Sequence, residues 1–278
     1  GGRPVADAAA RIDVAAAWGV PALPAGAGRD TEAIVSAVLA GTIGGLVVGG
    51  VDPDDTADPA ATRAAVERAG FVVALELRET DVTRAADVVF PVAPVTDKAG
   101  TFVTWEGRPR PFEAVFSNPA SLPDLRVLAG IAEELGAPLG FRTVAEARAE
   151  MEQLGPWDGT RASTPRPPAP AAPPAAAGTF ALATWKQMLD LGSMQDGDDF
   201  LRATARPAVA RLSAADLAAL GDDRVTVTGD RGSVTLPAVV ADDMTDGVVW
   251  VPANSFGDGV LADLASPGSR VTVKGAST

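Results

Sequence analysis

The chain has 278 residues and a formal net charge of −13, and it contains no cysteine, histidine or tyrosine. Without Cys and His it lacks the usual ligands of zinc, haem and iron–sulfur clusters, and it has no histidine general base. The acidic balance argues against nucleic acid or an anionic membrane surface as a partner, and no apolar run reaches the roughly 18 residues of a membrane helix.

The first domain alternates helix and strand signals. Asp30 is a suitable N-cap for a helix, and a buried strand follows at residues 45–50. Asp58 and Pro59 suit the start of a second helix. Two further β-rich runs follow at residues 71–75 and 88–91. Strand–helix–strand order with short connections predicts an α/β domain with a Rossmann-like parallel sheet.

Two more helices are expected before the domain ends. Ser121 with Asp124 and Thr143 with Glu146 both have the spacing of a capping box. Residues 160–178 then become rich in proline and alanine, a composition that favours polyproline II over a packed core. We therefore predict a domain of residues 1–159 and a linker of residues 160–178. The chain opens on Gly1 without a Met, which we interpret as the inside of a longer polypeptide.

The second domain, residues 179–278, has a different pattern. Residues 180–191 predict a short amphipathic helix, and residues 213–221 a capped one. Strict alternation at residues 224–228, a glycine-rich turn and residues 233–240 predict a β-hairpin. Two more strands are expected, at residues 248–251 and 270–274. A mostly-β unit of this size closes naturally as a barrel.

Two glycine-containing segments are candidates for ligand binding. Residues 26–31 precede a helix and have some features of a phosphate loop, but an ordinary helix start explains them as well. Gly49, Gly50 and Asp52 leave a predicted parallel strand at its carboxyl end. Ligands bind at that edge of open α/β sheets, although a tight strand-to-helix turn uses the same residues.

Residues 96–108 form a third candidate segment. Lys98 and Arg108 suit phosphate binding, and Glu106 suits a hydroxyl or an amine; surface ion pairs and a hairpin turn are the alternative. The acidic run at residues 196–199 does not have the spacing of a calcium loop and predicts a solvated turn. No catalytic residue and no metal ligand is assigned.

The order of these segments resembles the molybdopterin oxidoreductases. The resemblance rests on LVVGGVDP at residues 46–53, ADVVFPV at 86–92, KAGTF at 98–102 and EGR at 106–108, with VTV and VVWVP in the second domain. It implies a parallel-sheet domain followed by a β-barrel. It also implies the residues of a pterin-nucleotide site: Gly49, Gly50, Asp52, Lys98, Gly100, Thr101, Glu106 and Arg108.

Within that superfamily, the chain resembles the C-terminal part of the G-subunit family. The G subunit is the large iron–sulfur subunit of bacterial NADH:quinone oxidoreductase, or respiratory complex I. The resemblance implies electron transfer from NADH to quinone through iron–sulfur clusters elsewhere in the polypeptide, coupled to proton translocation. It also implies docking to other hydrophilic-arm subunits, on the cytoplasmic side of the plasma membrane, without nucleic acid or membrane insertion.

The site departs from the pattern of the catalytic relatives. They often carry a polar Asn before EGR, where this chain has Thr104-Trp105. We expect Trp105 to fill a pocket, so that the eight candidate residues are vestigial and this segment holds no cofactor. Two alternatives remain open. An active molybdopterin oxidoreductase such as a formate dehydrogenase would contain molybdenum and pterin. A non-enzymatic binding module would come from a polypeptide without N-terminal cluster-binding cysteines.

Overall fold

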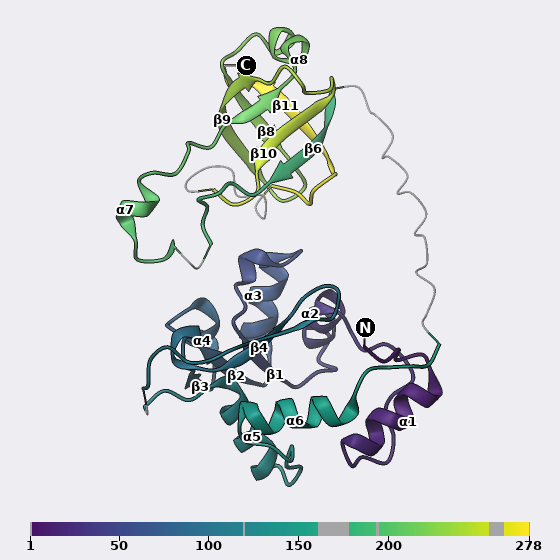
Figure 1. Cartoon of the computed structure of the whole chain (residues 1–278). Coiled ribbons are helices and arrows are strands. Elements are labelled where there is room, and N and C mark those ends of the chain that lie inside the picture. The colour runs from purple at the N-terminus through teal and green to yellow at the C-terminus, as the bar shows by residue number, and fades with distance from the viewer. Residues whose placement is uncertain (1, 119, 161–177, 193–194, 256–263, 278) are drawn as a thin grey trace. The chain divides into compact units, whose positions relative to one another are not determined.

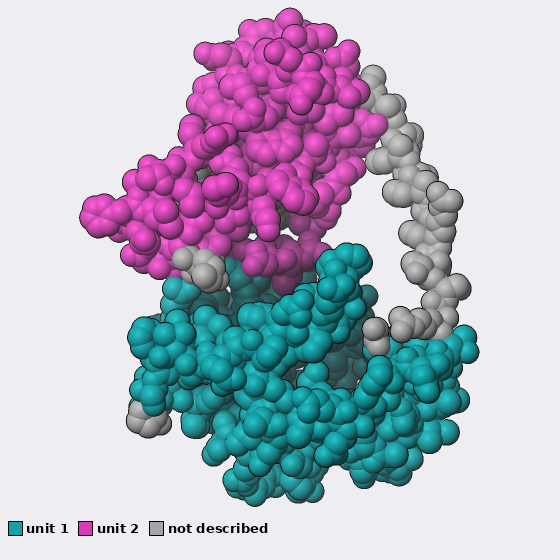
Figure 2. Space-filling model, in the orientation of Figure 1, with its two compact units in different colours: residues 1–53, 60–167 teal, residues 54–59, 168–278 magenta. Residues whose placement is uncertain are grey.

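A computed structural model describes residues 2–118, 120–160, 178–192, 195–255 and 264–277. The chain forms two compact units, which Figure 2 distinguishes by colour: residues 1–53 with 60–167, and residues 54–59 with 168–278. Nearly all of the expected linker lies outside the described residues, which omit 161–177.

Unit 1 combines helices with a small parallel sheet (Figure 1). In chain order its elements are α1 (Ala8–Ala17), α2 (Thr31–Leu39), β1 (Gly45–Gly49), η1 (Pro53–Asp55, which ends in unit 2), α3 (Pro59–Arg68), β2 (Phe71–Glu76), α4 (Asp81–Ala85), β3 (Val88–Pro91), η2 (Val95–Asp97), β4 (Gly100–Val103), β5 (Pro109–Phe112), α5 (Asp124–Glu134) and α6 (Val144–Leu154). The expected strands at 45–50, 71–75 and 88–91 are all present.

The sheet of unit 1 has the order β1-β2-β3, and both pairings are parallel. One face packs on α3 and α4 through a core of Val66, Val72, Ala74 and Val82. The other face packs on α5 through Leu75, Val92 and Val127. Helices on both faces are what a parallel sheet needs, because its strands are apolar on both sides.

Three of the four helix starts predicted in this unit are confirmed, including that of α3 at Pro59. The Asp30 side chain accepts a hydrogen bond from the Ala33 amide at 2.8 Å and caps α2. Because a carboxylate already occupies this helix start, the segment before it is an ordinary N-terminus rather than an anion site. Thr143 and Glu146 form the expected capping box, and the Arg142 amide is the main hydrogen-bond donor that holds the pKa of Glu146 below its usual value.

The capping box predicted at Ser121 is wrong. Helix α5 begins at Asp124 with Pro123 as its N-cap, and no side chain caps it. The helix therefore starts too late for Ser121 to reach an exposed amide. Its first turn carries Asp124 instead, and a carboxylate at this position is favourable in the field of the helix dipole.

Replacing Gly130 with alanine is expected to stabilise unit 1 by about 0.5–1 kcal/mol, since glycine in a helix interior costs this much relative to alanine. Gly130 lies inside α5, and a Cβ atom there meets nothing within 4 Å. Urea unfolding followed by far-UV circular dichroism measures the change. Unchanged or reduced stability would show that the surroundings of this position are tighter than described.

Unit 2 contains a closed barrel with strand order β10-β6-β11-β8-β9-β7, which confirms the predicted barrel. Its elements are β6 (Thr179–Trp185), α7 (Asp199–Arg202), β7 (Ala210–Leu212), α8 (Ala214–Leu220), β8 (Arg224–Thr228), β9 (Ser233–Val240), β10 (Val248–Pro252) and β11 (Arg270–Gly275). The largest side chains of its buried core are Leu182, Leu212, Leu236, Leu264, Val225, Val227, Val249, Val251 and Val271. The solvated turn expected at residues 196–199 is present at Asp196 and Gly197, whereas Asp198 caps α7 and Asp199 is the first residue of that helix.

The helix predicted at residues 180–191 is wrong, because its first half is strand β6. This strand pairs in parallel with β10 and antiparallel with β11. Leu182 is only 2% exposed, and its amide and carbonyl bond to Ser269 and Gly268 across the barrel, both at 2.9 Å. Pairing on both sides therefore overrides the local apolar pattern, which alone fits a helix.

The barrel is expected to lose stability as the pH falls from about 4 to about 2, through the carboxyl group of Asp222. The amides of Ser277 and Arg224 donate to this group at 2.9 and 3.1 Å, and Ser277 is the larger cause that lowers the pKa of Asp222 to about 2. Because the folded-state pKa lies below the unfolded one, the stabilisation is complete above the unfolded value and disappears as the group is protonated.

Urea unfolding of the wild type and of Asp222→Asn at pH 5, 3 and 2 tests this linkage. The difference in stability between the two proteins should shrink as the pH falls. Asp230→Asn is the matched control, because it removes a carboxyl group in the β8–β9 turn. A stability difference that stays constant with pH would show that Asp222 does not contribute to the loss of stability in acid.

Candidate functional site

The first three candidate residues form the turn at the carboxyl end of β1. Gly50 has a φ of +62°, and its amide donates to the carbonyl of Leu75 at 3.3 Å. A Cβ atom at Gly50 meets nothing within 4 Å, so this position requires glycine for its backbone conformation rather than for space. Gly49 and Asp52 are exposed on either side of it. The tight-turn interpretation accounts for Gly50, whereas a Cβ atom at Gly49 would make only ordinary contacts with Leu75.

Lys98 forms an ion pair with Asp124, in the first turn of α5. Its side chain is about three-quarters buried, since only 24% of it is exposed. The pair joins the segment before β4 to a helix that covers the sheet. The ammonium group is therefore already neutralised by a carboxylate, which agrees with the ion-pair alternative for this segment.

Gly100 and Thr101 are held by Arg148 of α6. The guanidinium group donates to the carbonyl of Gly100 at 2.5 Å, to Oγ1 of Thr101 at 2.9 Å and to the carbonyl of Phe112 at 3.3 Å, and it pairs with Glu113 at 3.1 Å. We call this set the Arg148 clamp. A Cβ atom at Gly100 would lie 2.5 Å from the Phe112 ring, so a larger residue here would require that ring to move.

Glu106 and Arg108 lie in the exposed turn that joins β4 to β5. The turn is closed by backbone hydrogen bonds from Gly107 to Thr104 at 2.8 Å and from Thr104 to Arg108 at 3.0 Å. Trp105 is 93% exposed at its tip. The expectation that Trp105 fills a pocket is therefore wrong, because the hairpin carries it away from the base that Arg148 holds.

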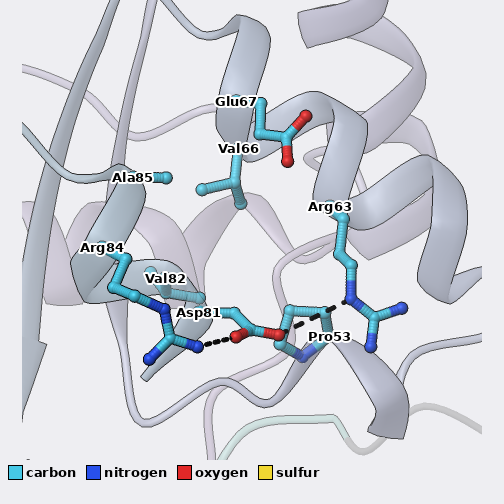
Figure 3. A pocket seen from close by; sticks show the side chains of 8 residues that line it. All are labelled: Pro53, Arg63, Val66, Glu67, Asp81, Val82, Arg84 and Ala85. Atoms are coloured by element: carbon cyan, nitrogen blue, oxygen red, sulfur yellow. Dashed lines mark hydrogen bonds and ion pairs between the residues drawn. The ribbon is translucent and has the colours of Figure 1, made fainter. Parts of the chain in front are cut away.

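A cavity of about 500 Å³ lies between α3 and α4 (Figure 3). Its lining residues are Pro53, Arg63, Val66, Glu67, Asp81, Val82, Arg84 and Ala85. In Figure 3, Arg63 and Arg84 both point at Asp81; the Arg63 Nε atom is 3.7 Å from Oδ2, and Arg84 pairs with the other oxygen. The two cations and the carboxylates of Asp81 and Glu67 balance, so the cavity has no excess charge for a phosphate.

A second cavity, of about 460 Å³, lies where β2 and β3 end. It is lined by Glu76, Leu77, Arg78, Glu79, Thr83, Arg84, Val89 and Pro91. Neither cavity is lined by any of the eight candidate residues. The sequence argument applied the carboxyl-end rule to β1 alone, and the same rule applied to β2 and β3 points to this second cavity.

The described part of the chain shows neither a group of metal ligands nor a helix that could cross a membrane. There, no group of three or more Asp, Glu, His or Cys side chains is arranged to hold a metal ion. Among the described helices, none combines the length and the apolar character that crossing a membrane requires.

Comparison with known proteins first defines the class of the fold. Residues 22–133 match the family described as "Molybdopterin oxidoreductase", and residues 180–276 match "Molydopterin dinucleotide binding domain". The solved structure of acetylene hydratase from Pelobacter acetylenicus has a similar fold, with a TM-score of 0.54 and 13% identity over 88% of this chain and 46% of that one. The chain thus has a molybdopterin oxidoreductase-like fold with mixed α/β structure and a β-barrel.

Sequence identity then defines the family. The G subunit of NADH-quinone oxidoreductase from Mycobacterium bovis is 48% identical over 98% of this chain and 34% of its own length. Formate dehydrogenase H of Escherichia coli is 30% identical over only 55% of this chain and 22% of its own length. The chain belongs to the G-subunit family of NADH-quinone oxidoreductase, as its motifs predicted, and it spans about a third of the length of the M. bovis relative, in the C-terminal part.

Proposed function

We propose that this chain is a structural part of the G subunit in an NADH:quinone oxidoreductase. Electrons would pass from NADH to quinone through iron–sulfur clusters elsewhere in the polypeptide, coupled to proton translocation. A Rossmann-like domain of residues 1–159 and a barrel domain of residues 179–278, joined by the linker 160–178, would brace those parts and contact other hydrophilic-arm subunits. This places the chain in the peripheral arm, on the cytoplasmic side of the plasma membrane, with no nucleic-acid partner and no membrane insertion.

One observation supports this proposal above the others: three of the candidate cofactor residues, Lys98, Gly100 and Thr101, are engaged in holding unit 1 together. Lys98 is paired with Asp124, and Gly100 and Thr101 accept from Arg148. Glu106 and Arg108 are exposed in the hairpin turn. These residues do not fit a cradle for a pterin nucleotide, because their polar groups are either already bonded to protein or turned to solvent. The eight positions are then a vestigial site, and no cofactor is expected in this segment.

The alternative, an active molybdopterin oxidoreductase such as a formate dehydrogenase, has less support. It requires Lys98 and Arg108 to approach one ligand, and the ion pair and the hairpin turn give each a separate structural role. The similarity to formate dehydrogenase H also covers a smaller part of the chain and at lower identity.

The double substitution Glu106→Ala with Arg108→Ala tests the proposal in the purified complex that contains this chain. NADH:quinone activity and iron content are expected to stay within about twofold of the wild type, because surface charges of this kind contribute little to stability. Glu32→Ala with Arg29→Ala, an exposed pair beside α2, is the matched control. If the Glu106/Arg108 variant loses activity in a fully assembled complex while the control variant keeps it, the hairpin contains a working site.

A further inference from the structure

One outer face of the barrel in unit 2 combines hydroxyl groups with two cations. Strands β11, β8 and β9 lie side by side there, and each is antiparallel to its neighbour (Figure 1). Alternate residues of these strands point into the buried core, where Val225, Val227 and Val273 lie. The residues between them point outward, and we call them the barrel face: Arg224, Thr226, Thr228, Ser233, Thr235, Pro237, Thr272 and Lys274.

The strand register places these side chains in rows across the barrel face. One row has a hydroxyl group on each strand: Thr272, Thr228 and Ser233. In the next row, Lys274 lies opposite Thr226, and the hydroxyl oxygens of Thr226 and Thr235 are 2.9 Å apart. Residues directly opposite on one face of a sheet have Cβ atoms about 4.5–5.5 Å apart. The hydroxyl groups and the ammonium group of Lys274 therefore form one continuous surface.

The barrel face carries no carboxylate, although the chain has 36 acidic residues and 23 basic ones. The acids nearest to β8 in sequence lie in the connections at its two ends: Asp222, Asp223 and Asp230. Arg224 and Lys274 are exposed, and within the described ranges neither forms an ion pair. The guanidinium group of Arg224 has one hydrogen bond among these residues, to the Thr235 carbonyl at 3.4 Å. Both cations can therefore pair with carboxylates from outside the chain.

The composition of the barrel face fits a protein partner that folds separately. None of its outward residues is a large apolar side chain. Obligate interfaces are mostly apolar, whereas contacts between separately folded proteins use complementary charges for specificity. A nucleic acid or an anionic membrane is negative throughout and would be repelled by a chain with a net charge of −13. A protein needs only a local cluster of carboxylates to fit this face.

We propose that the barrel face docks on a cluster of carboxylates in another subunit of the complex. Lys274 and Arg224 form ion pairs with that cluster, and the exposed hydroxyl groups of Thr228 and Thr272 donate hydrogen bonds to it. The contact is polar and depends on ionic strength, because exposed ion pairs are screened by salt. This inference rests on the proposed function, because it takes the other subunits of the complex as the source of the partner.

Zero-length carbodiimide cross-linking of the purified complex tests this contact, because the reaction joins an amine to a carboxylate that touches it. The chain has only three lysines, Lys98, Lys186 and Lys274, so mass spectrometry can follow each one. Lys98 pairs with Asp124 within unit 1, and their cross-link is the internal reference. Lys274 is expected to be joined to an Asp or Glu of another subunit. Cross-links of Lys274 within its own polypeptide alone, or none, would overturn the proposal.

A charge placed elsewhere on the barrel face tests whether the partner covers it. Ser233→Glu lies two strands away from Lys274 and leaves that lysine in place. It should lower the yield of the Lys274 cross-link between subunits by about fivefold or more, since like charges brought together oppose docking. Thr245→Glu, at an exposed threonine in the connection between β9 and β10, is the matched control and should leave the yield unchanged. Equal yields in the two variants would overturn the proposal.

Vesicles of phosphatidylglycerol and phosphatidylcholine in equal amounts distinguish a lipid partner. The full chain is expected to stay in the supernatant when these vesicles are sedimented. Sedimentation of the full chain with the vesicles, lost in Lys274→Glu, would assign the barrel face to a lipid surface and overturn the proposal.

The same preparations separate this inference from the proposed function. NADH:quinone activity of the assembled complex tests the function. Activity without a Lys274 cross-link to another subunit would leave the function standing and remove the docking contact, whereas that cross-link in a complex without the activity would do the reverse.

Discussion

Substitution of Gly229 by alanine is expected to lower the free energy of unfolding of the barrel by about 3 kcal/mol or more, because overpacking against a fixed backbone forces strands apart. A Cβ atom at this position would lie 2.0 Å from the carbonyl oxygen of Leu264 and 2.8 Å from the Cβ atom of Ala265. Both neighbours are fully buried, and the same carbonyl accepts the Arg231 amide at 3.1 Å. A shift of the Leu264 carbonyl would therefore strain its hydrogen bond with the Arg231 amide in the β8–β9 turn.

Urea unfolding followed by near-UV circular dichroism of the tryptophans measures this effect. Thr228→Ala, at the adjacent exposed end of β8, is the control and should cost less than about 1 kcal/mol. A Gly229→Ala protein as stable as the wild type would mean that the Leu264 segment packs differently against the turn.

Substitution of Arg148 by alanine has the second-largest expected effect, a loss of about 2–3 kcal/mol from the stability of unit 1. The Arg148 clamp binds two backbone carbonyls, a hydroxyl and a carboxylate. Charge-assisted hydrogen bonds contribute about 1.5–3 kcal/mol each when buried, and the partial exposure of Arg148 reduces that sum. Arg148→Lys should recover only part of the loss, since an ammonium group cannot reproduce the planar fork.

Hydrogen exchange in the hairpin gives the local measurement. Amides of β4 and β5 should exchange faster in Arg148→Ala, while those of β2 keep their rates. Arg110→Ala is the matched control. It removes a guanidinium group of the same hairpin whose one hydrogen bond among the described residues goes to the carbonyl of its neighbour Pro109, at 3.2 Å. Equal exchange rates of the β4 and β5 amides in the two variants would show that the Arg148 clamp does not stabilise the hairpin.

The parts of the fold that the sequence predicts correctly are those fixed by neighbouring residues. Strands β1, β2 and β3 are short apolar runs bounded by glycine or by a helix start. The hairpin β8–β9 follows from alternation and a glycine turn. Both signals are local, so no knowledge of distant partners is needed.

The errors arise where distant partners decide the outcome. Strand β6 is determined by pairing with β10 and β11, which lie about seventy to ninety residues further along the chain. Helix α4 has only five residues, too few for a periodic pattern, and its capping box between Thr80 and Thr83 is its only sequence signal. Short elements of this kind are stabilised mainly by packing, which no local window contains.

In the candidate site, too, the sequence predicts local features but not contacts with distant residues. Residue type suggested a phosphate contact for Lys98, and the family resemblance implied a ligand contact for Thr101, but their partners Asp124 and Arg148 are 26 and 47 residues away. No local pattern distinguishes a lysine that binds a phosphate from one that pairs with a helix start. The hairpin turn at residues 104–108 is local, and its glycine made that alternative visible in advance.

The molybdenum and pterin content of the native complex that contains this chain tests the central claim most directly. Metal analysis, together with the fluorescence of the oxidised pterin, should give well below one molybdenum and one pterin per chain in a preparation that oxidises NADH with a quinone. About one of each per chain, in that same active preparation, would contradict the scaffold role and make residues 98–108 part of a working cofactor site.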